Sequence, residues 1–295
     1  MQPELPKPNG LLGGLLALCA FATFATHDAF IKALGVTYST YQIIFFSSLF
    51  SIPYLIFTMW RARSFSIRPK HPRWIAARAV ASITTALTIF YAFKTLPLAE
   101  VYAIIFATPL VITALSIPIL GEQVGWRRWV AILVGLSGVI VVLQPGATPL
   151  SLAHLATLVA VFSGAFVSIT LRRIGKDERT GTLMFYPIAI NTLLMVPLLP
   201  GAWIAPDLTA LAMSALMAAF GYGGMLFLLA AYRRAGAAVV APMQYSQMLW
   251  AVLYGALFFS ETPAPRVFWG AAIIIASGIY ILWRESRIKA VQTET

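Results

Sequence analysis

The feature that most constrains this 295-residue chain is a series of ten long apolar segments joined by short polar connections. About 20 apolar residues in helical form cross the hydrocarbon core of a bilayer. Helices satisfy their backbone hydrogen bonds internally, whereas a membrane barrel would show alternating polarity. We therefore expect an all-α polytopic membrane protein with ten transmembrane helices. The segments are residues 10–31, 40–60, 74–93, 98–120, 126–143, 152–171, 182–199, 208–232, 238–259 and 267–283.

The composition excludes several other classes of protein. Hydrophobic residues make up 60% of the chain and charged residues 11%, whereas a soluble domain has about half and a quarter. The sequence has no HExxH motif, no Walker loop and no Cys/His cluster, so we expect no enzyme, no catalytic residue, no metal and no cofactor. The single cysteine, Cys19, excludes an intrachain disulfide.

The distribution of basic residues predicts the orientation. If the N-terminus is cytoplasmic, all but three of the 21 lysines and arginines fall on the cytoplasmic side, the exceptions being Lys32, Lys94 and Arg266. This bias follows the positive-inside rule, so the net charge of +11 indicates membrane orientation and no nucleic-acid partner. We predict a multi-pass protein of the cell inner membrane, with a cytoplasmic leader at residues 1–9 and a cytoplasmic tail at 285–295.

The two halves of the chain resemble each other. The aligned alanines are Ala92 with Ala230, Ala99 with Ala237 and Ala103 with Ala241. After short slips, the aligned pairs are Gly121-Glu122 with Ser260-Glu261, Trp129 with Trp269, and Ser137-Gly138 with Ser277-Gly278. Chance similarity between Ala- and Gly-rich helices is the alternative. We predict two five-helix repeats, at residues 10–143 and 152–284 with a linker at 144–151. Because five is odd, the second is inverted, as in secondary transporters.

The same motifs carry a resemblance to a known family. Leu120-Gly121-Glu122, Gly135-Leu136-Ser137-Gly138-Val139 and the stretch from Ser260-Glu261 to Ser277-Gly278-Ile279 resemble the EamA family of the drug/metabolite transporter superfamily. The resemblance covers about residues 10–283 and is nearest to YddG-type exporters of aromatic and other neutral amino acids. It implies a central cavity lined by helices three, four, eight and nine with one and six. Ser260 departs from the family's Gly-Glu pattern.

Polar residues inside the spans are candidates for substrate binding, because such residues are costly in lipid. Arg78, Ser82 and Thr85 share one face of the third helix. Arg78 could bind a substrate carboxylate, or it could anchor the helix end by snorkelling. On the ninth helix Gln244 and Gln247 share a face beside Tyr245, and on the fourth lies Tyr102. These groups could line a cavity or tie helices together.

Aromatic residues could form an apolar wall around these polar groups, as in many ligand pockets. The candidates are Phe24, Phe162, Phe166 and Tyr222, with Ser163 beside Phe162. Packing between helices, or contact with lipid, is the alternative for each of them.

Charged residues near the outer ends of the first and fourth helices suggest a gate. His27 and Asp28 could exchange protons, and Lys32 and Glu100 could close an outer gate. The alternative is an Asp28–Lys32 ion pair at i, i+4 that only helps to end the helix. Pro109 and Pro242 lie inside spans and are candidate hinges, because proline removes a backbone hydrogen bond.

These patterns predict a secondary transporter that moves a small molecule across the lipid bilayer by alternating access. Export of neutral or aromatic amino acids is the preferred activity. A drug or nucleotide-sugar carrier of the same superfamily is the alternative, and an intramembrane enzyme or a non-transporting scaffold is less well supported. The oligomeric state does not follow from the sequence.

Overall fold

The computed structural model describes residues 10–121, 126–144, 150–175, 177–235, 240 and 243–293. Helices make up most of this part of the chain, which confirms the all-α class. In order they are α1 (Gly10–Gly35), α2 (Thr40–Arg61), α3 (Pro72–Thr95), α4 (Leu98–Ile105), α5 (Thr108–Leu120), α6 (Trp126–Leu143), α7 (Leu152–Ile174), α8 (Thr180–Met195), η1 (Val196–Leu198), α9 (Leu208–Arg234), η2 (Gln244–Ser246), α11 (Gln247–Phe259) and α12 (Pro265–Thr293).

Within the described ranges, seven helical units are long and apolar enough to cross a membrane. They are α1, α2, α3, the unit of α4 and α5, α7, α8 with η1, and α9. Trp129–Leu143 of α6 and Pro265–Tyr280 of α12 are apolar but shorter. The chain is therefore a multi-pass membrane protein, while the count of ten spans stays a prediction.

Local signals in the sequence begin and end these helices. The hydroxyl of Ser39 accepts a hydrogen bond from the backbone N–H of Gln42 (3.3 Å) and caps α2. The Asp207 carboxylate accepts from the N–H of Ala210 (2.7 Å) and caps α9 in the same way. Gly121, with φ of 71°, ends α5 in the left-handed conformation that glycine adopts without strain.

The fourth predicted span, 98–120, is two helices rather than one. Pro109 lies in the first turn of α5 and has no N–H to donate to the carbonyl of Ile105. The Thr108 hydroxyl donates to that carbonyl instead (2.6 Å), and the helix is interrupted at Phe106 and Ala107. The 3₁₀ turn η2 begins at Gln244. In the repeat alignment that pairs Ala99 with Ala237, Gln244 is the residue that pairs with Phe106. The turn η2 of the second half therefore lies at the position that matches the interruption between α4 and α5 in the first half.

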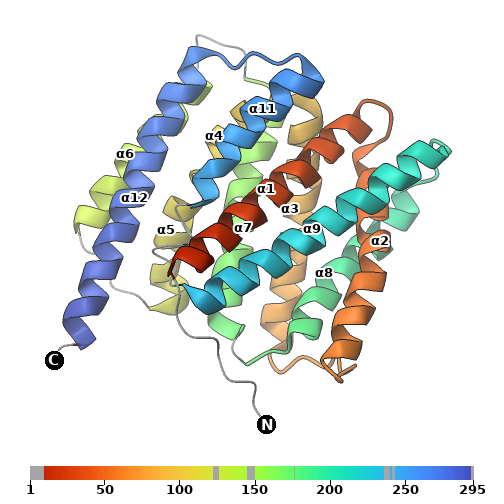
Figure 1. Ribbon diagram of the computed structural model, residues 1–295, viewed down its shortest axis with the longest axis horizontal. Coiled ribbons are helices and arrows are strands. Elements are labelled where there is room, and N and C mark those ends of the chain that lie inside the picture. The colour runs from red at the N-terminus through yellow and green to blue at the C-terminus, as the bar shows by residue number, and fades with distance from the viewer. Residues whose placement is uncertain are drawn as a thin grey trace.

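The helix pairings also match between the halves. Helix α1 packs on α9 as α3 packs on α7, and α2 contacts α9 as α8 contacts α3. Three further close pairs, α2 with α8, α4 with α11 and α6 with α12, join corresponding helices, and α5 packs on α7 as α11 packs on α1. Figure 1 shows α6 and α12 together at one edge of the bundle, and α2 with α8 at the other. The central helices α1, α3, α4, α7 and α9 lie between these two edges.

Glycine sets the close packing at the α6–α12 edge. A Cβ atom on Gly138 would lie 2.8 Å from the carbonyl oxygen of Gly270, so the two backbones touch. The Ser277 hydroxyl donates to the carbonyl of Ala131 across the same contact (2.5 Å). Small residues that let helices approach closely are typical of packing inside a membrane.

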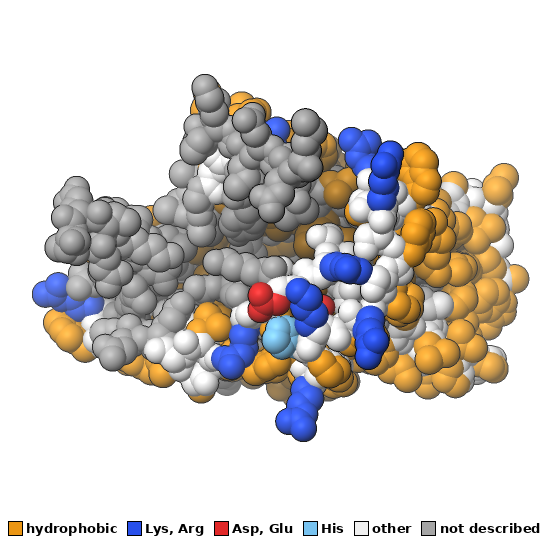
Figure 2. All heavy atoms as spheres, turned by 90° about the horizontal axis from the view of Figure 1, so that it is seen from below, with side chains coloured by type: hydrophobic (Ala, Val, Ile, Leu, Met, Phe, Trp, Pro, Cys, Tyr) orange, Lys and Arg blue, Asp and Glu red, His pale blue; other side chains and the backbone are white. Residues whose placement is uncertain are grey.

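The two ends of the bundle differ in charge. We call the end where α1 ends and α12 begins the upper end, and the end where α2 ends and α3 begins the lower end. Figure 2 shows lysine and arginine side chains gathered on the lower end. The exposed basic residues of α2 and the connection to α3 are Arg61, Arg63, Arg68, Lys70 and Arg73.

Several predicted features fall outside the described residues. They are the leader at 1–9, residues 145–149 of the linker, Glu122, Ala237, Ala241 and the candidate hinge Pro242.

Candidate substrate site

A polar cavity of 270 Å³ lies between helices from both halves of the chain. It brings together three residues predicted from the sequence: His27 of α1, Arg78 of α3 and Tyr222 of α9. The other lining residues are Ser47, Ser51, Leu183, Met184, Pro187, Ile188, Ala218, Gly221 and Met225. A few polar anchors in an apolar wall are the usual make-up of a small-molecule site.

Arg78 lines this cavity and has one N–H group without a partner among the described residues. Its Nη1 donates to the carbonyl of Leu183 on α8 (2.6 Å), and its Nε is buried without a partner among the described residues. A buried donor that makes no hydrogen bond costs about 1–3 kcal/mol, so such groups usually serve a ligand or water. The guanidinium is therefore held by the Nη1 contact, and its Nε–H remains without an acceptor such as a carboxylate.

His27 joins the cavity to a buried polar cluster. Its Nδ1 lies 2.8 Å from Oδ1 of Asp28, and the Tyr102 hydroxyl on α4 donates to Oδ2 of the same carboxylate. Tyr102 is fully buried and also interacts with the Gln247 amide at the start of α11. The structure thus brings four predicted residues, His27, Asp28, Tyr102 and Gln247, into one cluster from three helices.

Helix α2 supplies polar groups that the sequence analysis missed. Ser47 and Ser51 line the cavity, and the Thr58 hydroxyl hydrogen-bonds that of Tyr222. Tyr54 stacks on the Tyr222 ring with centroids 5.4 Å apart. The signal was present in the sequence, because residues 47, 51, 54 and 58 lie on one helical face.

Other predicted residues lie away from this cavity. Ser163 accepts a hydrogen bond from Thr85 (2.8 Å) between α7 and α3, and Phe24 packs on Gly224 of α9. The Tyr245 ring meets Phe106 edge-on, and its hydroxyl reaches Gly278 of α12. Phe162 is 58% exposed, on the α7 face that carries Leu155 and Val159. Ser82, Phe166 and Gln244 are half-buried and are not among the lining residues.

Lys32 does not form the i, i+4 pair with Asp28 that the sequence offered as the alternative to a gate, so that alternative is wrong. Its Nζ lies 2.6 Å from Oε1 of Glu261 and 2.6 Å from the carbonyl oxygen of Leu96. The other Glu261 oxygen accepts from the N–H of Leu98 (2.9 Å), the first residue of α4. A carboxylate at a helix N-terminus is favoured by the helix dipole. Glu261 of the second half thus caps α4 of the first half.

A second ion cluster lies at the upper end around Glu100. This buried carboxylate lies 3.1 Å from Nε2 of His154 and 3.5 Å from Nη2 of Arg266. His154 also forms a capping box with Ser151 at the start of α7. Glu100, His154 and Arg266 come from α4, α7 and α12, so this cluster joins both halves.

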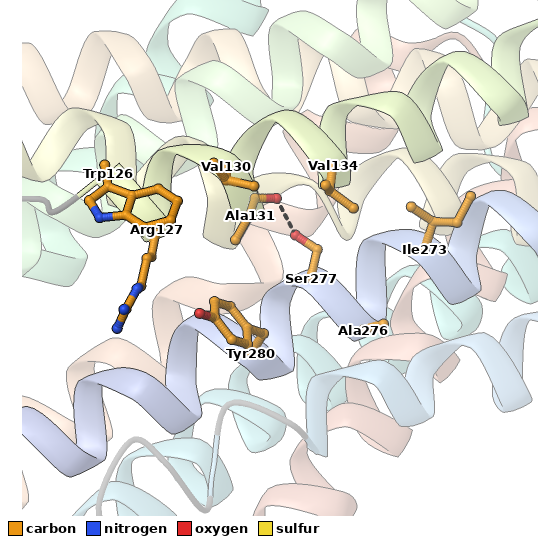
Figure 3. A pocket seen from close by; sticks show the side chains of 9 residues that line it. All are labelled: Trp126, Arg127, Val130, Ala131, Val134, Ile273, Ala276, Ser277 and Tyr280. Carbon is orange, nitrogen blue, oxygen red and sulfur yellow. Dashed lines mark hydrogen bonds between the residues drawn. The ribbon is translucent and has the colours of Figure 1, made fainter.

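A groove of 610 Å³ lies between α6 and α12, outside this cavity. Figure 3 shows its lining, which is almost entirely apolar, with Trp126 and Arg127 at one end and Tyr280 opposite them. Ser277 is turned toward Ala131 and uses its hydroxyl in the helix contact. This edge groove offers a substrate no polar anchor comparable to those of the central cavity.

Comparison with known proteins agrees with this architecture. The profile of the EamA-like transporter family matches residues 11–144 and 151–283, once in each half. A solved crystal structure superposes with a TM-score of 0.64 and 14% identity, over 94% of this chain and 98% of that one, which supports the fold alone.

Among the similar proteins is the S-adenosylmethionine uptake transporter of Rickettsia prowazekii, 26% identical over 95% of this chain and 94% of the relative. The pseudopaline exporter CntI of Pseudomonas aeruginosa is 26% identical over 90% of this chain and 94% of its own. A riboflavin transporter of Rhizobium johnstonii is 27% identical over 82% and 79%. The named activities are all transport, in both directions and of chemically different molecules.

Proposed function

This chain belongs to the EamA-like transporter family, and on that basis we propose that it carries a small carboxylate-bearing metabolite through the central cavity by alternating access. Family and relatives make it a membrane transporter and not an enzyme. The substrate class rests on one observation, the buried Nε of Arg78 without a partner in a cavity that both halves line.

Neutral and aromatic amino acids suit this cavity best. The carboxylate would pair with the free part of the Arg78 guanidinium, a charge-assisted contact favoured in a desolvated site. The apolar lining, which includes Met184, Ile188 and Met225, would accept an aliphatic or aromatic side chain. S-adenosylmethionine, the molecule named for one relative, is itself an amino-acid derivative. We propose export from the cell as the direction.

Two observations support two inverted repeats, at 10–143 and 152–284, that move against each other. Helix α1 packs on α9 as α3 packs on α7, and η2 lies at the position that matches the interruption between α4 and α5. The basic lower end supports a cytoplasmic position for both termini in the cell inner membrane. Interrupted helices, as at Phe106, are a recurrent feature of such transporters.

The test compares Arg78→Gln with wild-type protein in liposomes that exchange labelled amino acids. Losing a charged hydrogen bond costs about 1.5–3 kcal/mol, so affinity for L-phenylalanine should fall about 10- to 100-fold. Phenylalaninamide, which lacks the carboxylate, should bind weakly to wild-type protein and be little affected by the substitution.

Arg73→Gln is the matched control, because Arg73 is an exposed arginine in the first turn of the same helix. It should leave affinity unchanged. Equal binding of phenylalanine and its amide by wild-type protein would remove the carboxylate from the proposal. Exchange of riboflavin or a nucleotide sugar, and of no amino acid, would replace the amino-acid class.

A further inference from the structure

We propose that Nε2 of His27 is a shared binding site for a proton and for the ammonium group of the substrate, so that the transporter exchanges one for the other. The substrate part rests on the proposed amino-acid function. The proton part rests on the geometry of His27, Asp28 and Tyr102 and stands independently of the substrate.

The first step concerns which ring nitrogen is available. Nδ1 of His27 lies 2.8 Å from Asp28 Oδ1, so in the neutral ring the proton on Nδ1 is donated to that carboxylate. No described residue hydrogen-bonds to Nε2, and the ring lines the cavity. Nε2 therefore presents a lone pair that can accept one hydrogen bond or bind one proton.

Helix α9 packs closely against this ring. Gly221 faces the ring, and a Cβ atom there would lie 2.9 Å from Cδ2 and 3.3 Å from Nε2 of His27. A side chain at position 221 would collide with the ring, so the glycine leaves room for the ring at the wall of the cavity. On its other side the ring meets Phe90 edge-on, with centroids 6.1 Å apart, and makes no polar contact there.

The charged and titratable groups around the ring fix the electrostatics. From α1, Asp28 contacts the ring, while Lys32 forms an ion pair with Glu261 instead. Helix α3 contributes Arg78 to the same cavity, and α4 contributes Tyr102, which donates to Asp28. Helix α9 gives Tyr222, and α11 gives Tyr254, which hydrogen-bonds Thr26. The lining residues from α2 and α8 are uncharged. The charged side chains nearest to the ring are therefore the carboxylate of Asp28 and the guanidinium of Arg78.

Because Arg78 and His27 line the same cavity, the two charged groups of a zwitterionic amino acid would each have a partner there. Its carboxylate takes the free donor of Arg78, and its ammonium group donates to the lone pair of Nε2. A protonated Nε2 has no lone pair and repels the ammonium, so proton and substrate exclude each other. Substrate binding then releases the proton from Nε2 to water in the cavity, and substrate release allows a proton from water to bind again. An inward proton gradient would drive export by this exchange.

His27→Gln separates the two roles, because the Gln carbonyl can accept a hydrogen bond but binds no proton. In wild-type protein, affinity for labelled L-phenylalanine should fall about tenfold per pH unit on the acid side of the histidine range. The variant should keep the high-pH affinity and lose this pH dependence. On the acid side of that range, about one proton should be released per substrate bound by wild-type protein, read with a pH dye in weak buffer, and none by the variant.

His154→Gln is the matched control, because His154 also contacts a carboxylate, Glu100, but lies outside the cavity. It should keep both the pH dependence and the proton release. Should His27→Gln fail to fold, Asp28→Asn gives a second test. Without the carboxylate the protonated ring is less favoured, so binding should weaken only at a lower pH.

Unchanged affinity in wild-type protein between about pH 5 and 8, or pH dependence that survives in His27→Gln, overturns the proposal. If no amino acid binds at any pH, the amino-acid function fails and the proton site is tested alone. The chain has three histidines, so ¹⁵N-histidine spectra of wild-type and His27→Gln protein identify the His27 signal. A signal that responds to pH in that range supports the proton site, and a signal that does not respond overturns it.

Discussion

Tyr102 and Lys32 show at the scale of single residues what the sequence could and could not predict. Both were recognised as functional candidates because polar groups are costly inside apolar segments. Their partners were not predicted, since Asp28 and Glu261 come from other helices of the fold. The local i, i+4 rule suggested Asp28 for Lys32, but two backbone carbonyls and Glu261 surround the lysine instead.

Replacing Tyr102 by Phe should destabilise the protein. The change leaves one oxygen of the Asp28 carboxylate without its donor in a buried site, at a cost of about 1–3 kcal/mol. The melting temperature in detergent should fall. Tyr41→Phe, at an exposed tyrosine of α2, is the control and should melt like wild type. Equal melting of all three proteins would mean that the Tyr102–Asp28 hydrogen bond contributes little.

At the scale of elements, apolar runs predicted the helices well and their interruptions poorly. Continuous hydrophobicity from 98 to 120 gave no sign that α4 and α5 are separate, although Pro109 was recognised as a candidate hinge. The interruption depends on the Thr108 hydroxyl taking over the Ile105 carbonyl, a detail that hydropathy does not report. Helix faces were also hard to assign, as Phe162 shows, because an apolar residue suits lipid and cavity equally.

Replacing Pro109 by Ala should slow transport more than it weakens binding. The alanine N–H can bond the Ile105 carbonyl and favour one continuous helix, which stiffens the joint between α4 and α5. We expect up to about tenfold slower exchange, or about 1.4 kcal/mol on the barrier, with affinity nearly unchanged. Pro118→Ala, inside α5, is the control. Parallel loss of rate and affinity would argue against a hinge.

At the scale of the whole molecule, ion pairs and hydrogen bonds join the two halves at both ends. The upper end has the Lys32–Glu261 and Glu100–His154 pairs. At the lower end, buried Glu178 accepts from the N–H of His71 (2.6 Å). The sequence predicted two repeats from their aligned residues. It could not predict that α1 packs on α9 and α3 on α7, because the apolar surface of a helix does not specify which other helix it packs against.

Glu261→Gln should loosen the upper end, since breaking a largely buried ion pair costs about 3 kcal/mol. The readout is labelling of a cysteine placed at Ser47 in the cavity, in a Cys19→Ser background, by a reagent confined to the upper side. Labelling should become several-fold faster. Glu178→Gln is the counterpart and should speed labelling from the lower side instead. Identical effects from both sides would indicate general loosening.

The contact of Gly138 with Gly270 has a further consequence. Where two backbones touch, no smaller separation is available, and any larger one would open a void that acyl chains fill poorly. This edge of the molecule should therefore act as a fixed reference length while the central helices shift. Spin labels attached to α6 and α12 should report the same spacing with and without substrate. That spacing would then serve as a reference distance for measuring displacements of the other helices.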